Sequence, residues 1–167
     1  IPYLIDAAKM LEKSGADFLV MPCNTLHMFI EEMRSSVKVP VLSIIEETIK
    51  FLKNKNIKKV GILVTPSIIK NKLYEKAMKK EGIEQVLPDG FDQAKVGKII
   101  NNIVLSRHAN KDRQELLKII DKFKEKGVKN VILACTDLQL LIPHHPKIKI
   151  FDTMKIFADA TIDYILE

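Results

Sequence analysis

Short apolar runs and amphipathic stretches alternate along the chain. Four runs have the continuous hydrophobic character of strands buried in a parallel sheet, and they lie at residues 18–21, 41–42, 59–64 and 131–134. Elsewhere apolar positions recur at three- and four-residue spacing, which predicts helices at 4–14, 26–33, 45–52, 65–80, 94–105, 112–126 and 154–166. Weaker patterns predict strands at 85–87 and 147–151. This alternation is typical of an α/β fold in which helices flank parallel sheets.

The pattern occurs twice. Gly15 precedes Cys23 by eight residues, and Gly127 precedes Cys135 by the same eight. In each copy a helix ends at the glycine, a strand runs to the cysteine, and a helix, a strand and a helix follow. The chain has 2 cysteines, and they occupy equivalent corners of the two copies. We therefore predict two pseudo-symmetric lobes, each with a parallel sheet, with both thiols facing one cleft between them.

The charged stretch 53–59 is the predicted boundary between the lobes. Residues 1–50 together with 151–167 would form the first lobe, and residues 51–150 the second. The chain opens at Ile1 inside a helical pattern. We therefore expect that the strand that would open the first lobe is missing from it.

Cys23 lies at a predicted strand-to-helix corner. The backbone amides and the helix dipole at such a corner favour a thiolate and can hold a carboxylate. Asn24 and Thr25 are residue types that cap helices, and either could also donate a hydrogen bond to an anion. On its own, the corner is equally consistent with a small buried thiol beside an ordinary cap.

Composition excludes several classes of protein. With 167 residues, of which 47% are hydrophobic, the chain can bury a core. No apolar run approaches the roughly 20 residues of a membrane span. The net charge of +6 comes mainly from lysine, and no basic cluster is interleaved with aromatics, which disfavours nucleic-acid binding. Two cysteines without a close spacing indicate reduced thiols, so we expect a cytoplasmic protein.

The segment Met21-Pro-Cys-Asn-Thr-Leu-His27 resembles the first cysteine motif of the cofactor-independent aspartate/glutamate racemases. Cys135-Thr136-Asp137 resembles the second motif, which ends in Glu in that family. Thr65 and Tyr74 match a third, and Phe151-Asp152-Thr153 resembles the end of the family's sequences. The resemblance covers essentially the whole chain. It implies two α/β lobes, an active site between them, an amino-acid substrate, no cofactor, no metal and a homodimer.

The chain departs from the family at several positions. The opening Gly-rich loop is not evident, and Ser67 and Ile68 replace a Gly-Thr pair. Asp137 is shorter than the family's Glu. Aspartate racemases carry a lysine for the substrate's side chain where this chain has Leu105, so Arg107 is the nearby candidate cation. These departures affect the predicted substrate more than the predicted chemistry.

The resemblance implies that Cys23 and Cys135 are two bases on opposite faces of the substrate Cα. One takes the α-proton as a thiolate and the other delivers a proton as a thiol. Asn24, Thr25, Thr65 and Thr136 would hold the substrate carboxylate, with Arg107 at the distal end.

Three supporting residues have alternatives that stay open. His27 tunes the thiol or is a packed, hydrogen-bonded histidine. Asp152 orients the amine or caps the last helix, and Asp137 supports the site or is merely the cap in the second lobe. A zinc site with His144 and His145 is disfavoured, because no ligand pair has the usual close spacing.

We predict an amino-acid racemase specific for aspartate or glutamate. The alternatives are a hydantoin racemase, a maleate isomerase, a decarboxylase with two cysteines, or a two-lobe binding protein without catalysis. A redox dithiol protein is disfavoured because the sequence has no Cys-x-x-Cys motif.

Overall fold

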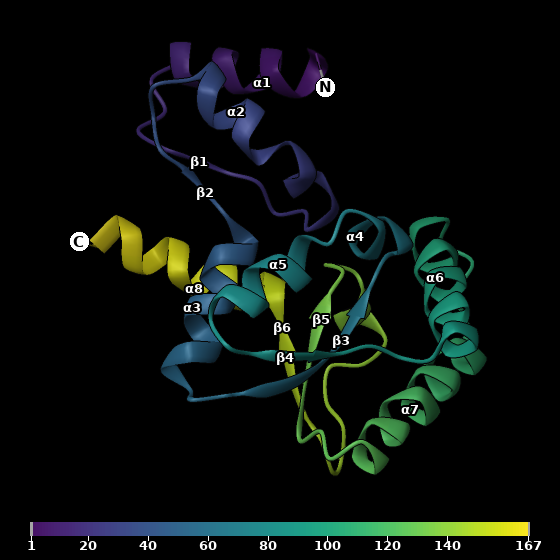
Figure 1. The fold of residues 1–167 in the computed structure, drawn as a ribbon. Helices are drawn as coiled ribbons and strands as arrows, with labels where there is room; N and C mark the ends of the chain where they lie inside the picture. Colours follow the sequence, from purple (N-terminus) through teal and green to yellow (C-terminus); the bar gives the residue numbers. More distant parts are fainter. Residues whose placement is uncertain (1, 167) are drawn as a thin grey trace.

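Helices and parallel strands alternate in the computed structural model, which describes residues 2–166 (Figure 1). The strands of this part are β1 (Leu19–Val20), β2 (Val41–Leu42), β3 (Lys59–Val64), β4 (Glu84–Val86), β5 (Asn130–Ala134) and β6 (Lys149–Asp152). The α-helices are α1 (Pro2–Lys13), α2 (Ile30–Ser36), α3 (Ile44–Asn54), α4 (Pro66–Lys70), α5 (Leu73–Lys80), α6 (Gly90–Val104), α7 (Asn110–Glu125) and α8 (Thr153–Leu166). Two 3₁₀ helices are η1 (Thr25–Phe29) and η2 (Leu138–Leu140). The predicted α/β fold with parallel sheets is confirmed.

The strands form two sheets. β1 pairs with β2, and the larger sheet has the order β4-β3-β5-β6, with every pairing parallel. In the larger sheet Leu63 of β3 lies opposite Leu133 of β5, and Leu133 lies opposite Asp152 of β6. Because β3 and β5 are central, their side chains are covered on both faces.

Helices cover both faces of the larger sheet, with α6 and α7 on one side and α3, α5 and α8 on the other (Figure 1). Successive side chains of a strand point to opposite faces. Accordingly Leu63 packs in the core with α6 and α7, whereas its neighbour Ile62 packs in the core with α3 and α5. Gly61 allows the close approach of α7, because a Cβ there would lie 2.9 Å from Val131 and 3.1 Å from Phe123.

The smaller sheet has a core of its own. Leu19 of β1 and Val41 of β2 are buried against Ala8 of α1 and Met33 of α2. In Figure 1, α1 and α2 lie together at the top beside β1 and β2, away from the four-stranded sheet.

Two helices, α3 and α8, pack on the large sheet, and each has one end near the small sheet. Ile44 and Leu52 of α3, with Phe157 of α8, belong to the same core as β3. Near its end, α8 places Tyr164 against Phe18, with ring centroids 5.0 Å apart. The division into a lobe of residues 1–50 plus 151–167 and a lobe of 51–150 stays a prediction.

Three predicted helices differ from those observed. The helix expected from Leu26 begins as a 3₁₀ turn, and Asn24 makes no side-chain cap bond to it. The helix expected over 65–80 is interrupted, because Lys72 adopts a left-handed conformation with φ 54° between α4 and α5. The short helix expected after Cys135 is the 3₁₀ turn η2.

Candidate active site

Both cysteines lie just beyond the carboxyl end of a parallel strand. Cys23 follows β1 after Met21 and Pro22, and its amide donates to the carbonyl of Met21 at 2.8 Å. Cys135 directly follows β5. A 3₁₀ turn comes soon after each cysteine, and both thiols are free. Ligands of α/β proteins bind at this end of the strands.

Burial sets the protonation of Cys135. The residue is 9% exposed, and burial raises the pKa of its thiol. A hydrogen bond from the backbone of Asp137 lowers that pKa, whereas the charges of Asp137 and of Cys23 raise it. At this corner burial outweighs the single backbone hydrogen bond, so the surroundings of Cys135 favour the protonated thiol.

Asn24 is held in a buried network. Its Oδ1 accepts a hydrogen bond from the hydroxyl of Tyr74 at 2.6 Å, and its Nδ2 donates to the hydroxyl of Thr153 at 3.1 Å. Asn24, Tyr74 and Thr153 are all buried. The predicted role of Asn24 as a ligand contact stays a prediction, but its side chain has two protein partners.

Thr25 and Thr65, both predicted substrate contacts, lie together. Their hydroxyl oxygens are 3.1 Å apart, although 40 residues separate them in the sequence. Thr65 also caps α4, since its hydroxyl accepts from the amide of Ile68 at 3.4 Å. The turn after Cys23 is thereby joined to the end of β3.

His27 is buried, with hydrogen bonds to both of its ring nitrogens. The amide of Ile44 donates to Nε2 at 3.1 Å, so Nε2 carries a lone pair. Nδ1 therefore carries the proton and donates to the carbonyl of Cys23 at 2.8 Å. Burial lowers the pKa of His27, which favours this neutral form. His27 thus links the backbone of Cys23 to the first turn of α3.

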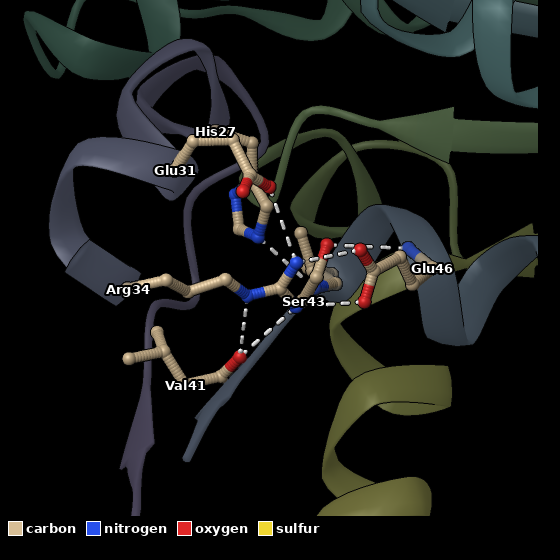
Figure 2. Close-up of polar contacts among 7 residues, drawn as sticks. His27, Glu31, Arg34, Val41, Ser43 and Glu46 are labelled. Carbon is tan, nitrogen blue, oxygen red and sulfur yellow. Dashed lines mark hydrogen bonds and ion pairs between the residues drawn. The ribbon is translucent and has the colours of Figure 1, made fainter. Parts of the chain in front are cut away.

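Arg34 of α2 and Glu46 of α3 form a second connection to the first turn of α3, which sequence analysis missed. Two guanidinium nitrogens of Arg34 donate to the two carboxylate oxygens of Glu46 at 2.9 and 2.8 Å (Figure 2). Arg34 also donates twice to the carbonyl of Val41 in β2. The only signal in the sequence was the scarcity of arginine, which does not identify a partner.

The remaining predicted site residues lie in different settings. Thr136 and Asp137 follow Cys135 and are half-buried, and Asp137 makes no side-chain cap bond to η2. Asp152 accepts from the amide of Met154 at 2.9 Å, as expected of a cap for α8, and burial raises the pKa of its carboxyl. Arg107 is exposed in the turn between α6 and α7.

His145 has a structural setting of its own. Its Nδ1 accepts from the amides of Lys147 and Ile148 at 3.3 and 3.1 Å, whereas His144 is exposed. Within residues 2–166 no group of three or more His, Cys, Asp or Glu residues is arranged to hold a metal ion. In the same part of the chain, no helix is both long and apolar enough to cross a membrane.

The sequence profile of the Asp/Glu/hydantoin racemases matches residues 1–161. The chain belongs to this family. It is 35% identical over 164 residues to the broad specificity amino-acid racemase RacX of Bacillus subtilis, covering 98% of this chain and 71% of that protein. It is 28% identical over 146 residues to the glutamate racemase of Aquifex pyrophilus, covering 84% of this chain and 54% of that enzyme.

Solved structures of the racemase family have the same fold. An aspartate racemase homologue from Pyrococcus horikoshii superimposes with a TM-score of 0.86 at 28% identity, covering 99% of this chain and 74% of that one. The aspartate racemase of Picrophilus torridus gives a TM-score of 0.85 at 26% identity, covering 98% and 68%. The chain spans between 54% and 74% of the length of these four relatives. The resemblance inferred from the cysteine motifs is confirmed, and with it membership of a family of isomerases.

Proposed function

We propose that this protein is a cofactor-independent amino-acid racemase that uses Cys23 and Cys135 as its two bases. The observation that carries the proposal is the equivalent placement of two free thiols, each just beyond the carboxyl end of a parallel strand. A binding protein has no need of such a pair. Family membership supports the same chemistry.

Cys135 is the proposed proton donor of the resting enzyme. Burial raises the pKa of its thiol, which favours the protonated form. Cys23, which is more exposed, is then the base that takes the α-proton from one enantiomer, while Cys135 gives its proton to the opposite face of Cα. The reverse reaction exchanges the roles. Amides and hydroxyls near Asn24, Thr25, Thr65 and Thr136 would stabilise the charge that develops on the substrate carboxylate.

The substrate that we propose is aspartate or glutamate, with Arg107 binding the distal carboxylate. A buried carboxylate needs a paired cation, and the guanidinium group can bind both carboxylate oxygens. Because Leu105 stands where a lysine is expected, a substrate with a neutral side chain is the second candidate. That candidate is favoured by the similarity to a racemase of broad specificity.

Racemisation by single-cysteine variants tests the proposed chemistry. Cys23→Ala and Cys135→Ala should each abolish racemisation in both directions, because one base cannot serve both faces of Cα. Each variant should still exchange the α-proton of one enantiomer with solvent deuterium, followed by NMR. Normal racemisation by either variant would refute the mechanism.

A substrate panel tests the proposed specificity. We expect aspartate or glutamate to give the highest kcat/KM, and Arg107→Ala to raise KM for the acidic substrate while leaving alkylation of both thiols unchanged. Turnover of neutral amino acids, with no effect of Arg107→Ala, would favour the second candidate. Hydantoins and maleate belong in the panel, and binding without turnover would indicate a non-catalytic protein.

A further inference from the structure

Three hydrogen bonds connect the turn after Cys23 with the strand before Cys135. The hydroxyl of Tyr74 in α5 donates to Oδ1 of Asn24 at 2.6 Å, and Nδ2 of Asn24 donates to the hydroxyl of Thr153 in α8 at 3.1 Å. The hydroxyl of Thr153 then donates to the carbonyl of Leu133 in β5 at 2.8 Å. We call this series the Tyr74–Leu133 chain. Its second member, Asn24, lies one residue after Cys23, and its last member, Leu133, lies two residues before Cys135.

The direction of every bond in the Tyr74–Leu133 chain is fixed from one end. The carbonyl of Leu133 can only accept, so the single hydroxyl proton of Thr153 points to it. Thr153 must then accept from Asn24, which requires the amide nitrogen of Asn24 on that side. The amide oxygen consequently faces Tyr74, and Tyr74 must donate. A reversed amide at Asn24 would place its oxygen against the hydroxyl oxygen of Thr153 with no proton between them, so that contact would be lost.

Because the three side chains are buried, each of these bonds depends on its protein partner. Tyr74 is 1% exposed, Asn24 2% and Thr153 0%, so solvent cannot replace a lost partner. Burial also raises the pKa of Tyr74, which keeps its phenol protonated as a donor. The chain crosses from the segment after β1 to β5, a central strand of the large sheet.

We propose that Tyr74 and Thr153 are positioning residues that hold Asn24 in one orientation and thereby fix the turn of Cys23 relative to β5 and Cys135. The proposal rests on the proposed racemase function, in which two thiols must reach opposite faces of one carbon atom. A displacement of about 1 Å between reacting groups can cost about a hundredfold in rate. Neither hydroxyl contacts a reacting atom in this scheme, because both are used within the chain.

Site-resolved alkylation tests the proposal without reference to racemisation. Tyr74→Phe and Thr153→Val remove one hydroxyl each with little change of shape. Each should change the rate of iodoacetamide labelling at Cys23 by about threefold or more, since thiol reactivity follows the local charge and hydrogen bonding. Thr153→Val should change labelling at Cys135 as well. Mass spectrometry of the two cysteine peptides measures both rates below the melting temperature.

Matched controls exist in α8. Thr161 donates to the carbonyl of Phe157 at 2.7 Å, so Thr161→Val removes a similar bond from the same helix outside the chain. Tyr164→Phe removes a phenol hydroxyl from a partly exposed ring. Both controls should label at the wild-type rates. Tyr74→Phe and Thr153→Val could lower the melting temperature and leave both cysteines labelled at the wild-type rates. In that case the chain only stabilises the fold, and the proposal is overturned.

The kinetics of the Tyr74→Phe/Thr153→Val double variant give a second readout. If both residues act through Asn24, each single variant should lower kcat about tenfold to a hundredfold with a smaller change in KM, and the double variant should be no worse than the more impaired single one. Losses that multiply, or wild-type kcat in both single variants, would overturn the proposal. If the wild-type protein racemises no amino acid, the proposed function fails, and the labelling rates still decide the positioning role.

Discussion

At the scale of single residues, the surroundings of each side chain decide what it can do. Cys23 and Cys135 are the same residue type at similar corners, yet Cys135 is the more buried and its thiol has a raised pKa. His27, despite its place in the cysteine motif, bonds to the carbonyl of Cys23 and not to the thiol. Of its two predicted roles, the hydrogen-bonded, packed histidine describes the observed contacts.

The titration of Cys135 gives a prediction at this scale. Asp137→Asn removes a negative charge that raises the pKa of Cys135, while the backbone amide that bonds to the sulfur stays. The wild-type pKa lies above the ordinary value of 9.0, so the midpoint of alkylation against pH should move down in the variant. Mass spectrometry of the Cys135 peptide at successive pH values measures it.

The control for this prediction is Asp159→Asn in α8, where the carboxylate is exposed and pairs with Lys155. Its Cys135 midpoint should equal that of the wild type. An upward shift in Asp137→Asn would mean that the substitution had disturbed the backbone hydrogen bond, contrary to the geometry described here.

At the scale of elements, local pattern and tertiary contacts decide different features. The apolar run at 59–64 predicted β3 to the residue, because a strand buried on both faces leaves no polar interruption. The break between α4 and α5 was not predicted, because Lys72 and Leu73 are ordinary helix formers and Asn71 alone does not mark the end of a helix. The left-handed conformation there is set by how α4 and α5 pack, which the sequence pattern does not contain.

Local sequence patterns also made parts of the site predictable. The repeated spacing located Cys23 and Cys135, and the family motifs located Thr25 and Thr65, whose hydroxyls the structure brings together. The Tyr74–Leu133 chain was not predictable as a unit. Its contacts join residues 50 and 129 positions apart, and polar side chains give no periodic signal.

The break at Lys72 gives a prediction at the element scale. A lysine with φ 54° pays a steric penalty that glycine does not, so Lys72→Gly should raise the free energy of unfolding by about 0.5–1 kcal/mol. Urea denaturation followed by circular dichroism measures the change. Lys70→Gly, inside α4, should instead lower stability by up to about 1 kcal/mol. Destabilisation by both would show that the contacts of Lys72 outweigh its strain.

At the scale of the whole molecule, side-chain hydrogen bonds connect the N-terminal region with the large sheet, whereas the hydrophobic cores of the two sheets are separate. The small sheet has its own core with α1 and α2, and the large sheet has two. His27 and Arg34 each bond from this N-terminal region to the start of α3, which packs on the large sheet. The stability of the whole molecule should therefore respond to the protonation of His27.

Mild acid should destabilise the protein. Burial lowers the pKa of His27 and of His145, so between the unfolded value of 6.5 and about pH 5 the unfolded chain binds more protons than the folded one. Stability is then lost as the pH falls through this window, by up to about 1.4 kcal/mol per unit of pKa difference. Urea midpoints measured from pH 7.5 to 5 test this.

Histidine variants identify the source of this pH dependence. His27→Gln should be less stable at pH 7.5, since it loses the two bonds of the ring, and should show a shallower slope between pH 6.5 and 5. His145→Gln should flatten the remainder. His144→Gln, at an exposed position, should follow the wild-type curve. An unchanged slope in both His27→Gln and His145→Gln would rule out these two residues as the acid-sensitive groups.

The fixed donor-to-acceptor direction of the Tyr74–Leu133 chain also limits which substitutions the protein can accept. The side chain of Leu133 can be replaced, but the carbonyl that accepts from Thr153 is present whatever residue stands there. As long as β5 stays in place, every residue at position 133 presents this carbonyl. Position 153 must therefore still supply a hydrogen-bond donor. Aspartate at position 24 would match asparagine in shape but would have no N–H to give to Thr153. A backbone atom in the central sheet thus restricts which codons are acceptable beside a cysteine more than one hundred positions earlier in the sequence.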